Sequence, residues 1–234
     1  MFLLALLVFL IGSLVWAVPW TSGETLVYEV LWQSTPVGHQ EMTIEGNGET
    51  WHYRGEAVPE GVGRVVGGYA LRAEGLMGPD FFTRKFHKEL VLPRQGVRIL
   101  DATVAQNLEV RVQSTDGKVR SYSSPTTTVL DDISMLYHVR VNPDVDQVQF
   151  VDFPGLVVAP IKHLESRTIE TALGKFSARG YSFEGGETKV EVWVSESPER
   201  YPVMIRYGSG FSTLIARLIE VKSVTTGTSS AVRN

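Results

Sequence analysis

Apolar and polar side chains alternate along most of this chain with a period of two residues. The clearest stretches are 24–33, 106–114 and 187–195, and each has one apolar face. Alternation of this kind is typical of β-strands. Turn-forming pairs such as Asp116-Gly117 and Gly185-Gly186 separate the stretches at short spacing, which favours antiparallel hairpins. The predicted strands are 24–33, 37–45, 50–57, 69–76, 81–92, 97–101, 106–114, 117–123, 147–153, 156–171, 175–184, 187–195, 202–208 and 211–221.

One segment, 131–140, departs from this pattern. Ile133, Leu136 and Tyr137 follow one another at the spacing of a helical face, and Pro143 stops the run. The aspartates at 131 and 132 are suited to cap a helix start. We predict one short helix here and, in addition, a tether between Asp132 and Arg140.

The segment 211–221 fits both a helical stripe and a strand. Its β-branched residues and the preceding Gly208-Ser209-Gly210 turn favour the strand. The predicted fold is mainly β, with a single antiparallel, strongly curved sheet that forms a barrel or half-barrel, since large twisted sheets curl. The domain is expected to span 18–222, with a flexible tail at 223–234.

The first seventeen residues, 1–17, contain no charged side chain and end in Val15-Trp16-Ala17. An apolar run that ends in small residues predicts a signal peptide cleaved after Ala17. The alternative is an uncleaved membrane anchor, because no Lys or Arg precedes the apolar run, although the run is short for a spanning helix. Either way we expect an exported protein of the periplasm or cell envelope.

The net charge is −4, and the chain contains no cysteine. The negative charge argues against nucleic-acid partners, and the lack of cysteine excludes disulfides, thiolate chemistry and a lipidated cysteine. The histidines (His39, His52, His87, His138 and His163) show no metal-ligand spacing. We therefore predict no metal and no cofactor.

Three sequence blocks resemble the DUF3108 family of exported bacterial proteins. Residues 132–140 match its D-x-S-x-L-Y-x-x-R signature, 26–30 with Val37-Gly38 resemble its opening hairpin, and 192–203 resemble its W-x-S-x-D…R-x-P-V hairpin. Ser197 stands where that hairpin usually has Asp. The resemblance implies export and carries over no activity; its general look is similar to the curved, incompletely closed barrels of lipoprotein carriers.

Several strands carry apolar residues on both faces, so something must cover the second face. It is covered either by the protein itself or by a ligand or partner. We predict a non-enzymatic protein that binds an apolar or amphipathic, lipid-like molecule in the curved sheet, with the helix closing the mouth and Arg140 at a polar head group. The candidate ligand-binding residues are Tyr28, Trp32, Asp132, Leu136, Tyr137, Arg140 and Trp193.

Two other functions stay open at this point. A structural or assembly protein would pair a strand edge with another envelope component. A hydrolase would use Asp131, Asp132 and His138, but no nucleophile and base can be paired from the spacing, so we favour a non-enzymatic role.

Overall fold

The computed structural model describes residues 23–65, 70–92, 96–105, 109–115, 117–124, 128–152, 155–185, 188–209 and 212–224. The predicted signal peptide at 1–17 lies outside these ranges, as does the predicted tail from residue 225 onward. Within the described ranges, no helix has the length and apolar character needed to cross a membrane.

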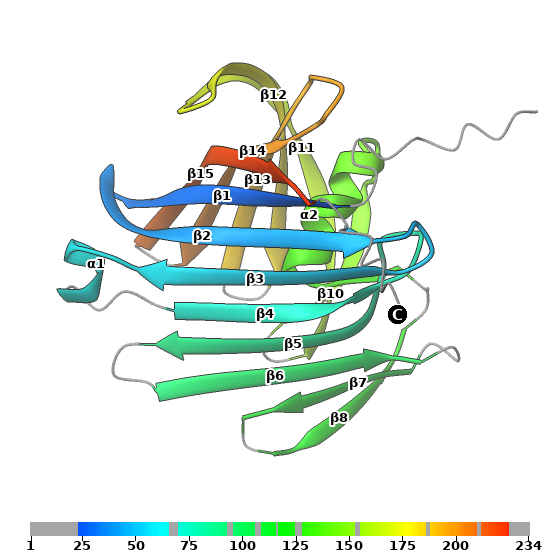
Figure 1. Cartoon of the computed structure of the whole chain (residues 1–234). Coiled ribbons are helices and arrows are strands. Elements are labelled where there is room, and N and C mark those ends of the chain that lie inside the picture. Colours follow the sequence, from blue (N-terminus) through cyan, green and yellow to red (C-terminus); the bar gives the residue numbers. More distant parts are fainter. Residues whose placement is uncertain are drawn as a thin grey trace, which may run out of the picture.

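Among the described residues, fifteen strands form one sheet and two helices accompany it (Figure 1). The strands are β1 (Gly23–Trp32), β2 (Thr35–Gly46), β3 (Trp51–Pro59), β4 (Ala70–Met77), β5 (Thr83–Leu92), β6 (Gly96–Val104), β7 (Glu109–Ser114), β8 (Val119–Ser123), β9 (Val129–Leu130), β10 (Gln147–Asp152), β11 (Gly155–Thr171), β12 (Gly174–Gly185), β13 (Thr188–Ser195), β14 (Pro202–Ser209) and β15 (Ser212–Ser223). The helices are α1 (Val62–Val65) and α2 (Asp132–Val141).

The sheet consists of two meanders that are joined in its middle, where the first strand, β1, pairs with the last strand, β15. Strands β1 to β8 pair in sequence, β10 to β15 do the same, and β1 pairs with β15. Figure 1 shows β2 to β8 as a front wall, with β10 to β14 crossing behind it. The edges of the sheet are β8 and β9, so the sheet is barrel-like without being closed.

The prediction of a purely antiparallel sheet is wrong at one place. Strand β9 pairs with β10 in parallel, through Val129 with Gln149 and Leu130 with Phe150. A parallel pair requires a crossover connection, and α2 supplies it between these two strands. Two residues of strand are too short to produce an alternation signal, which explains why β9 was not predicted.

Side chains from the edge strand β8 and the residue just after it reach the other end of the sheet at β10 and β11. The Tyr122 ring from β8 covers Gly155 at the start of β11: a Cβ added at 155 would lie 2.1 Å from the Tyr122 hydroxyl. Next to this contact, the Ser124 hydroxyl donates to the side-chain oxygen of Gln149 at 2.7 Å. In the described residues, no backbone hydrogen bonds join β8 to the other end of the sheet, and side-chain contacts join them instead.

Helix α2 lies inside the barrel-like sheet. Every residue from Ile133 to Arg140 is buried, so no face of the helix is left to solvent. The predicted helix is confirmed to within one residue, but it does not close the mouth from outside as we expected: it fills the interior. Its apolar residues therefore point in all directions, which is the pattern of a helix surrounded by protein.

The outer face of the sheet is covered in part by the sheet itself. The far end of the β11–β12 hairpin, residues 165–176, is called the arm below. A bulge between Leu164 and Arg167 interrupts the pairing, and beyond it β11 contacts β14 and β15, which are not its ladder partners. The arm residue Ile169 is buried near the tip of this hairpin, and Figure 1 shows the hairpin bending toward the side of β14 and β15. For β14 and β15, apolar residues on the outer face are thus explained by the arm, while α2 packs against the inner face of the sheet.

All fourteen predicted strands have a counterpart, and the ambiguous segment 211–221 is confirmed as a strand, β15. The elements that the prediction missed are α1 and β9, which are four and two residues long.

Candidate functional site

The N-terminal end of α2 is fixed by a buried carboxylate. One oxygen of Asp131 accepts from the backbone N–H of Ile133 and Ser134, at 2.8 and 3.1 Å, and so caps the helix as predicted. The other oxygen accepts from the hydroxyls of Tyr53 on β3 and Thr83 on β5. Asp131 is 0% exposed, so this carboxylate links the helix to the front wall in a buried environment, where hydrogen bonds are stronger than in water.

Next to it, Asp132 pairs with a lysine. The Lys88 ammonium contacts the carboxylate of Asp132 and lies 3.1 Å from that of Asp152 on β10. Burial, with help from Asp152, raises the pKa of Asp132 to about 6, while Lys88 opposes this rise. The predicted tether between Asp132 and Arg140 is wrong: these residues begin and end a helix of ten residues, and each has its own partner.

The C-terminal end of α2 is held by Arg140, which is 0% exposed. Its guanidinium forms an ion pair with Glu24 on β1 and donates to the backbone carbonyls of Glu199 and Arg200, at 3.0 and 2.8 Å. It also lies 5.2 Å from the centre of the Tyr137 ring. These contacts give Arg140 a structural role in seating the helix.

The structure brings four of the predicted ligand residues together. Tyr28, Leu136, Tyr137 and Arg140 are all buried on the inner side of the sheet, where Tyr28 donates to the carbonyl of Pro202 at 2.9 Å. Trp32 is on the same face of β1 as Tyr28 but four residues further along, and it is partly exposed. Asp132 is at the opposite end of α2 from Arg140.

Trp193 does not belong to this group. The register places Trp193 beside Gly180 and Met204, while the neighbouring Val192 shares the inner face with Tyr181. The Arg167 guanidinium of the arm lies 3.7 Å from the centre of the Trp193 ring on the outer face. The expectation that Trp193 joins Tyr28 and Arg140 in one site is therefore wrong, because the sheet lies between them.

A cavity of about 590 Å³ opens at the C-terminal end of α2; we call it the α2 cavity. Its floor is Arg140, and its apolar lining comes from Val141, Pro143 and Pro198. Two further arginines, Arg179 on β12 and Arg200 in the β13–β14 loop, line it as well. The cavity thus offers both cationic and apolar contacts.

Tyr181 also lines the α2 cavity, close to Arg179 and Arg200. It is 0% exposed, and its O–H has no hydrogen-bond acceptor of normal geometry among the described residues. Burial raises the pKa of Tyr181, so the hydroxyl keeps its proton and remains a donor. Buried polar groups are nearly always hydrogen-bonded, so an unsatisfied donor at a cavity wall indicates a place for an acceptor.

Arg200 has an unusual position at the cavity wall. Its backbone is in the left-handed region (φ 51°), and its guanidinium donates to the carbonyl of Val139 at 3.3 Å. Burial lowers the pKa of Arg200, and the like charges of Arg140 and Arg179 lower it further. These arginines repel one another at the cavity.

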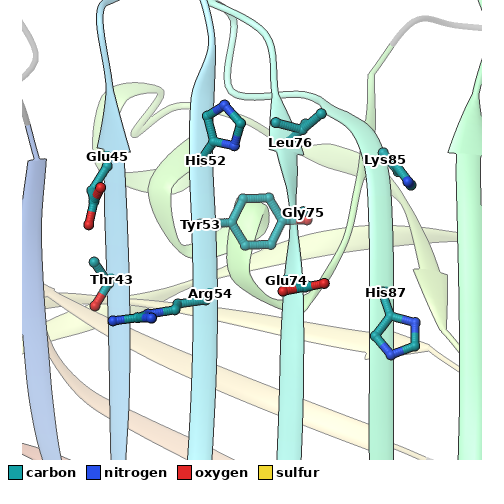
Figure 2. Close-up of a pocket in the computed structure, with 10 residues that line it drawn as sticks. All are labelled: Thr43, Glu45, His52, Tyr53, Arg54, Glu74, Gly75, Leu76, Lys85 and His87. Atoms are coloured by element: carbon teal, nitrogen blue, oxygen red, sulfur yellow. The ribbon is translucent and has the colours of Figure 1, made fainter.

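A second hollow, of about 400 Å³, lies on the outer face of β2 to β5 (Figure 2). Figure 2 shows Arg54, Glu74 and His87 on three neighbouring strands of this face. Nearby side chains satisfy one another, as in the pair of His87 with Asp101 at 2.7 Å. None of the predicted ligand residues lines this hollow.

His138, a residue of the alternative hydrolase, is a core residue. It is 4% exposed, its ring lies 5.1 Å from that of Phe82, and burial lowers its pKa to about 4. In the described part of the chain, no group of three or more His, Cys, Asp or Glu is arranged to hold a metal ion.

Sequence reasoning missed Arg179, Tyr181 and Arg200. They come from β12 and from a loop, 38 or more residues beyond the end of α2 along the chain, so no local motif joins them to it. One signal in the sequence could have pointed to Arg200. This residue directly precedes Tyr201-Pro202, within the block that resembles the DUF3108 hairpin.

Comparison with solved structures supports the fold. The chain is similar to a β-barrel-like protein of the domain of unknown function DUF1849 from Brucella abortus, with a TM-score of 0.61 and 8% identity, over 88% of this chain and 99% of that one. At this identity the likeness concerns the fold alone.

Two further structures align over most of their length with low scores. The hypothetical protein CT021 from Chlamydia trachomatis has a TM-score of 0.32 at 9% identity, over 89% of this chain and 92% of that one. MucB in complex with MucA(peri) has a TM-score of 0.21 at 6% identity, over 89% and 95%. Neither score supports an argument about this chain. No family model and no curated protein matches it.

Proposed function

We propose that this chain is an exported, non-enzymatic binding protein that holds an amphipathic molecule in the α2 cavity. The observation that carries the proposal is the make-up of that cavity. Arginines from the helix, a strand and a loop meet there beside an apolar lining and an unpaired buried hydroxyl. Pockets that combine apolar walls with a few convergent polar groups are typical ligand sites.

Two binding places can be compared, the α2 cavity and the inner face of the sheet, and the position of α2 favours the cavity. The ligand was first expected against Tyr28, Leu136 and Tyr137, but these side chains pack on one another and are buried. Displacing α2 would break buried ion pairs at both of its ends, each of which is costly to open. A ligand at the end of the helix avoids that cost.

Export rests on the apolar segment 1–17 and its small-residue end. Membership of the DUF3108 family remains a prediction from the three sequence blocks, and the solved structure with the similar fold is named for a different domain, DUF1849. A periplasmic or envelope location is part of the proposal.

Native mass spectrometry of the mature protein, purified from the envelope of its own source, tests this function. We expect a bound small molecule that leaves on denaturation, with the denatured and refolded protein as the mass baseline. Recovery of protein at the baseline mass only, from several gentle extraction conditions, would refute a carrier role.

A role in assembly is the second candidate, and the edge strand β8 favours it. Among the described strands, β8 pairs with β7 alone, and Val119 at its start is 61% exposed. Exposed strand edges accept a strand from a partner. A photo-reactive residue placed at Val119 is expected to cross-link to an envelope protein in cells if this role holds, and one at the arm residue Leu173 serves as the control. Equal labelling at the two positions would speak against it.

A further inference from the structure

One wall of the α2 cavity contains Tyr181, a buried hydrogen-bond donor. The Tyr181 O–H is buried and finds no acceptor of normal geometry in the described part of the chain, and Tyr181 lines the same cavity as Arg179 and Arg200. The His163 ring meets the Tyr181 ring edge-on, with ring centres 5.5 Å apart, so the phenol is held in place. A fixed donor of this kind recognises an acceptor, and two guanidinium groups beside it favour one with negative charge.

The present contacts of the two arginines are weak. Arg179 reaches Asp144 at 3.6 Å, and the two side chains are 44% and 87% exposed. Exposed pairs of this type contribute little and exchange readily. Arg200 makes one long hydrogen bond, to a backbone carbonyl. Both guanidinium groups therefore have donors to offer to a ligand.

Two acidic side chains lie near the α2 cavity. Asp144 is on the exposed loop after α2, and Glu196 lines the cavity wall. The carboxylate of Glu196 accepts hydrogen bonds from the hydroxyls of Ser166 and Ser177. The third arginine, Arg140, is already neutralised by Glu24. Arg179 is close to both Asp144 and Glu196, so an anion that enters the cavity competes with these two carboxylates for Arg179.

We propose that the α2 cavity binds the anionic head of an amphipathic molecule, a phosphate or carboxylate, through Arg179, Arg200 and the Tyr181 hydroxyl. The chain of the ligand then lies against Val141, Pro143 and Pro198. This assignment rests on the proposed function and adds to it the chemical class of the ligand and the residues that grip its head. Arg140 remains the support beneath the site.

Calorimetric titration of the mature protein with dodecyl phosphate, below its micellar concentration, tests the assignment. Dodecyl maltoside has the same chain with a neutral head, and inorganic phosphate has the head without the chain. We expect dodecyl phosphate to bind at least about tenfold more tightly than dodecyl maltoside, since hydrogen bonds to charged groups are the strong ones. We expect the same margin over inorganic phosphate, because the alkyl chain buries apolar surface.

Two variants locate the site. Arg179→Gln removes one charge, and Tyr181→Phe removes only the unpaired hydroxyl, so the fold is expected to tolerate both. Each is expected to weaken dodecyl phosphate binding by about tenfold. Arg72→Gln is the matched control, because Arg72 is an exposed arginine that pairs with Glu56 on the outer face. Unchanged melting temperatures confirm that the variants are folded.

The outcomes separate the site from the function. If Arg179→Gln and Tyr181→Phe bind dodecyl phosphate as tightly as the parent, or if Arg72→Gln is equally weakened, the assignment to the α2 cavity is wrong. Equal affinity for dodecyl maltoside overturns the anionic head, and equal affinity for inorganic phosphate overturns the amphipathic ligand. If native mass spectrometry finds the ligand on the Arg179→Gln variant too, the proposed function holds but the assignment of the ligand to these residues is wrong.

Discussion

Arg140 and Glu24 form a buried ion pair between residues 116 positions apart in the sequence. Glu24 lies at the start of β1, and Arg140 lies in the last turn of α2, with side chains 7% and 0% exposed. The pair joins the central helix to the strand at which the two halves of the sheet meet. It therefore helps to determine where α2 ends, and with it where the α2 cavity opens.

Arg140→Leu is expected to lower the free energy of unfolding by about 3–5 kcal/mol, because it leaves the Glu24 carboxylate buried without a partner. The double variant Arg140→Leu with Glu24→Leu is expected to recover a large part of this loss, since both charges are then gone. Urea denaturation measures both effects. A loss of less than about 1 kcal/mol in the single variant would indicate that the pair does not seat the helix.

The stability of this protein is expected to change little between about pH 4 and pH 6, because two groups act in opposite directions. The pKa of Asp132 is raised to about 6 in the folded state, so its contribution to stability falls as the pH rises through this range. The pKa of His138 is lowered to about 4, so its contribution is lost as the pH falls below 6.5.

Asp132→Asn removes the first of these contributions and leaves that of His138. The free energy of unfolding of this variant is therefore expected to rise from pH 4.5 to pH 6.5 more steeply than that of the parent, as measured by urea denaturation at each pH. Parallel pH profiles for the two proteins would show that Asp132 does not titrate in this range.

Much of the fold follows from local pattern, while the site does not. The alternation in 24–33 and 187–195 is enough to predict β1 and β13, because a strand with one apolar face must bury it. The cap at Asp131 is also a local signal, satisfied by the next three residues. The partner of Arg140 is not local: a ten-residue helix with cations and anions at its ends gives no information about which distant strand will supply the opposite charge.

When both faces of a strand are apolar, the alternation of its residues does not show which face points to the interior of the sheet. Trp193 and Val192 are adjacent and both buried, one under the arm and one toward the interior. Only the bend at Leu164–Arg167, which folds the arm back over the sheet, decides between them. That bend depends on long-range packing, so the sequence placed Trp193 in the wrong group.

Trp193→Leu is expected to lower the free energy of unfolding by roughly 1–3 kcal/mol, through lost packing and the lost contact with Arg167, without changing the affinity for dodecyl phosphate. The reason is that Trp193 is on the opposite face of the sheet from the α2 cavity. Denaturation and calorimetry on the same preparation test both statements. A weaker affinity in a variant of unchanged fold would place Trp193 in the site after all.

Gly155→Ala is expected to lower stability by about 1–3 kcal/mol, because the new methyl group overlaps the Tyr122 ring at the seam between the sheet edges. Tyr122→Ala in the same chain is expected to make Gly155→Ala much less costly. A double-mutant cycle by thermal denaturation measures this coupling. Additive effects of the two substitutions would mean that the ring does not cover Gly155.

A crystal structure of the mature protein with dodecyl phosphate tests the central claim most directly. We expect the phosphate within hydrogen-bonding distance of Arg179, Arg200 and the Tyr181 hydroxyl, with Asp144 moved off Arg179 and α2 still held by the pair of Arg140 and Glu24. A phosphate bound elsewhere, or an alkyl chain that displaces α2 from the interior of the sheet, would contradict it.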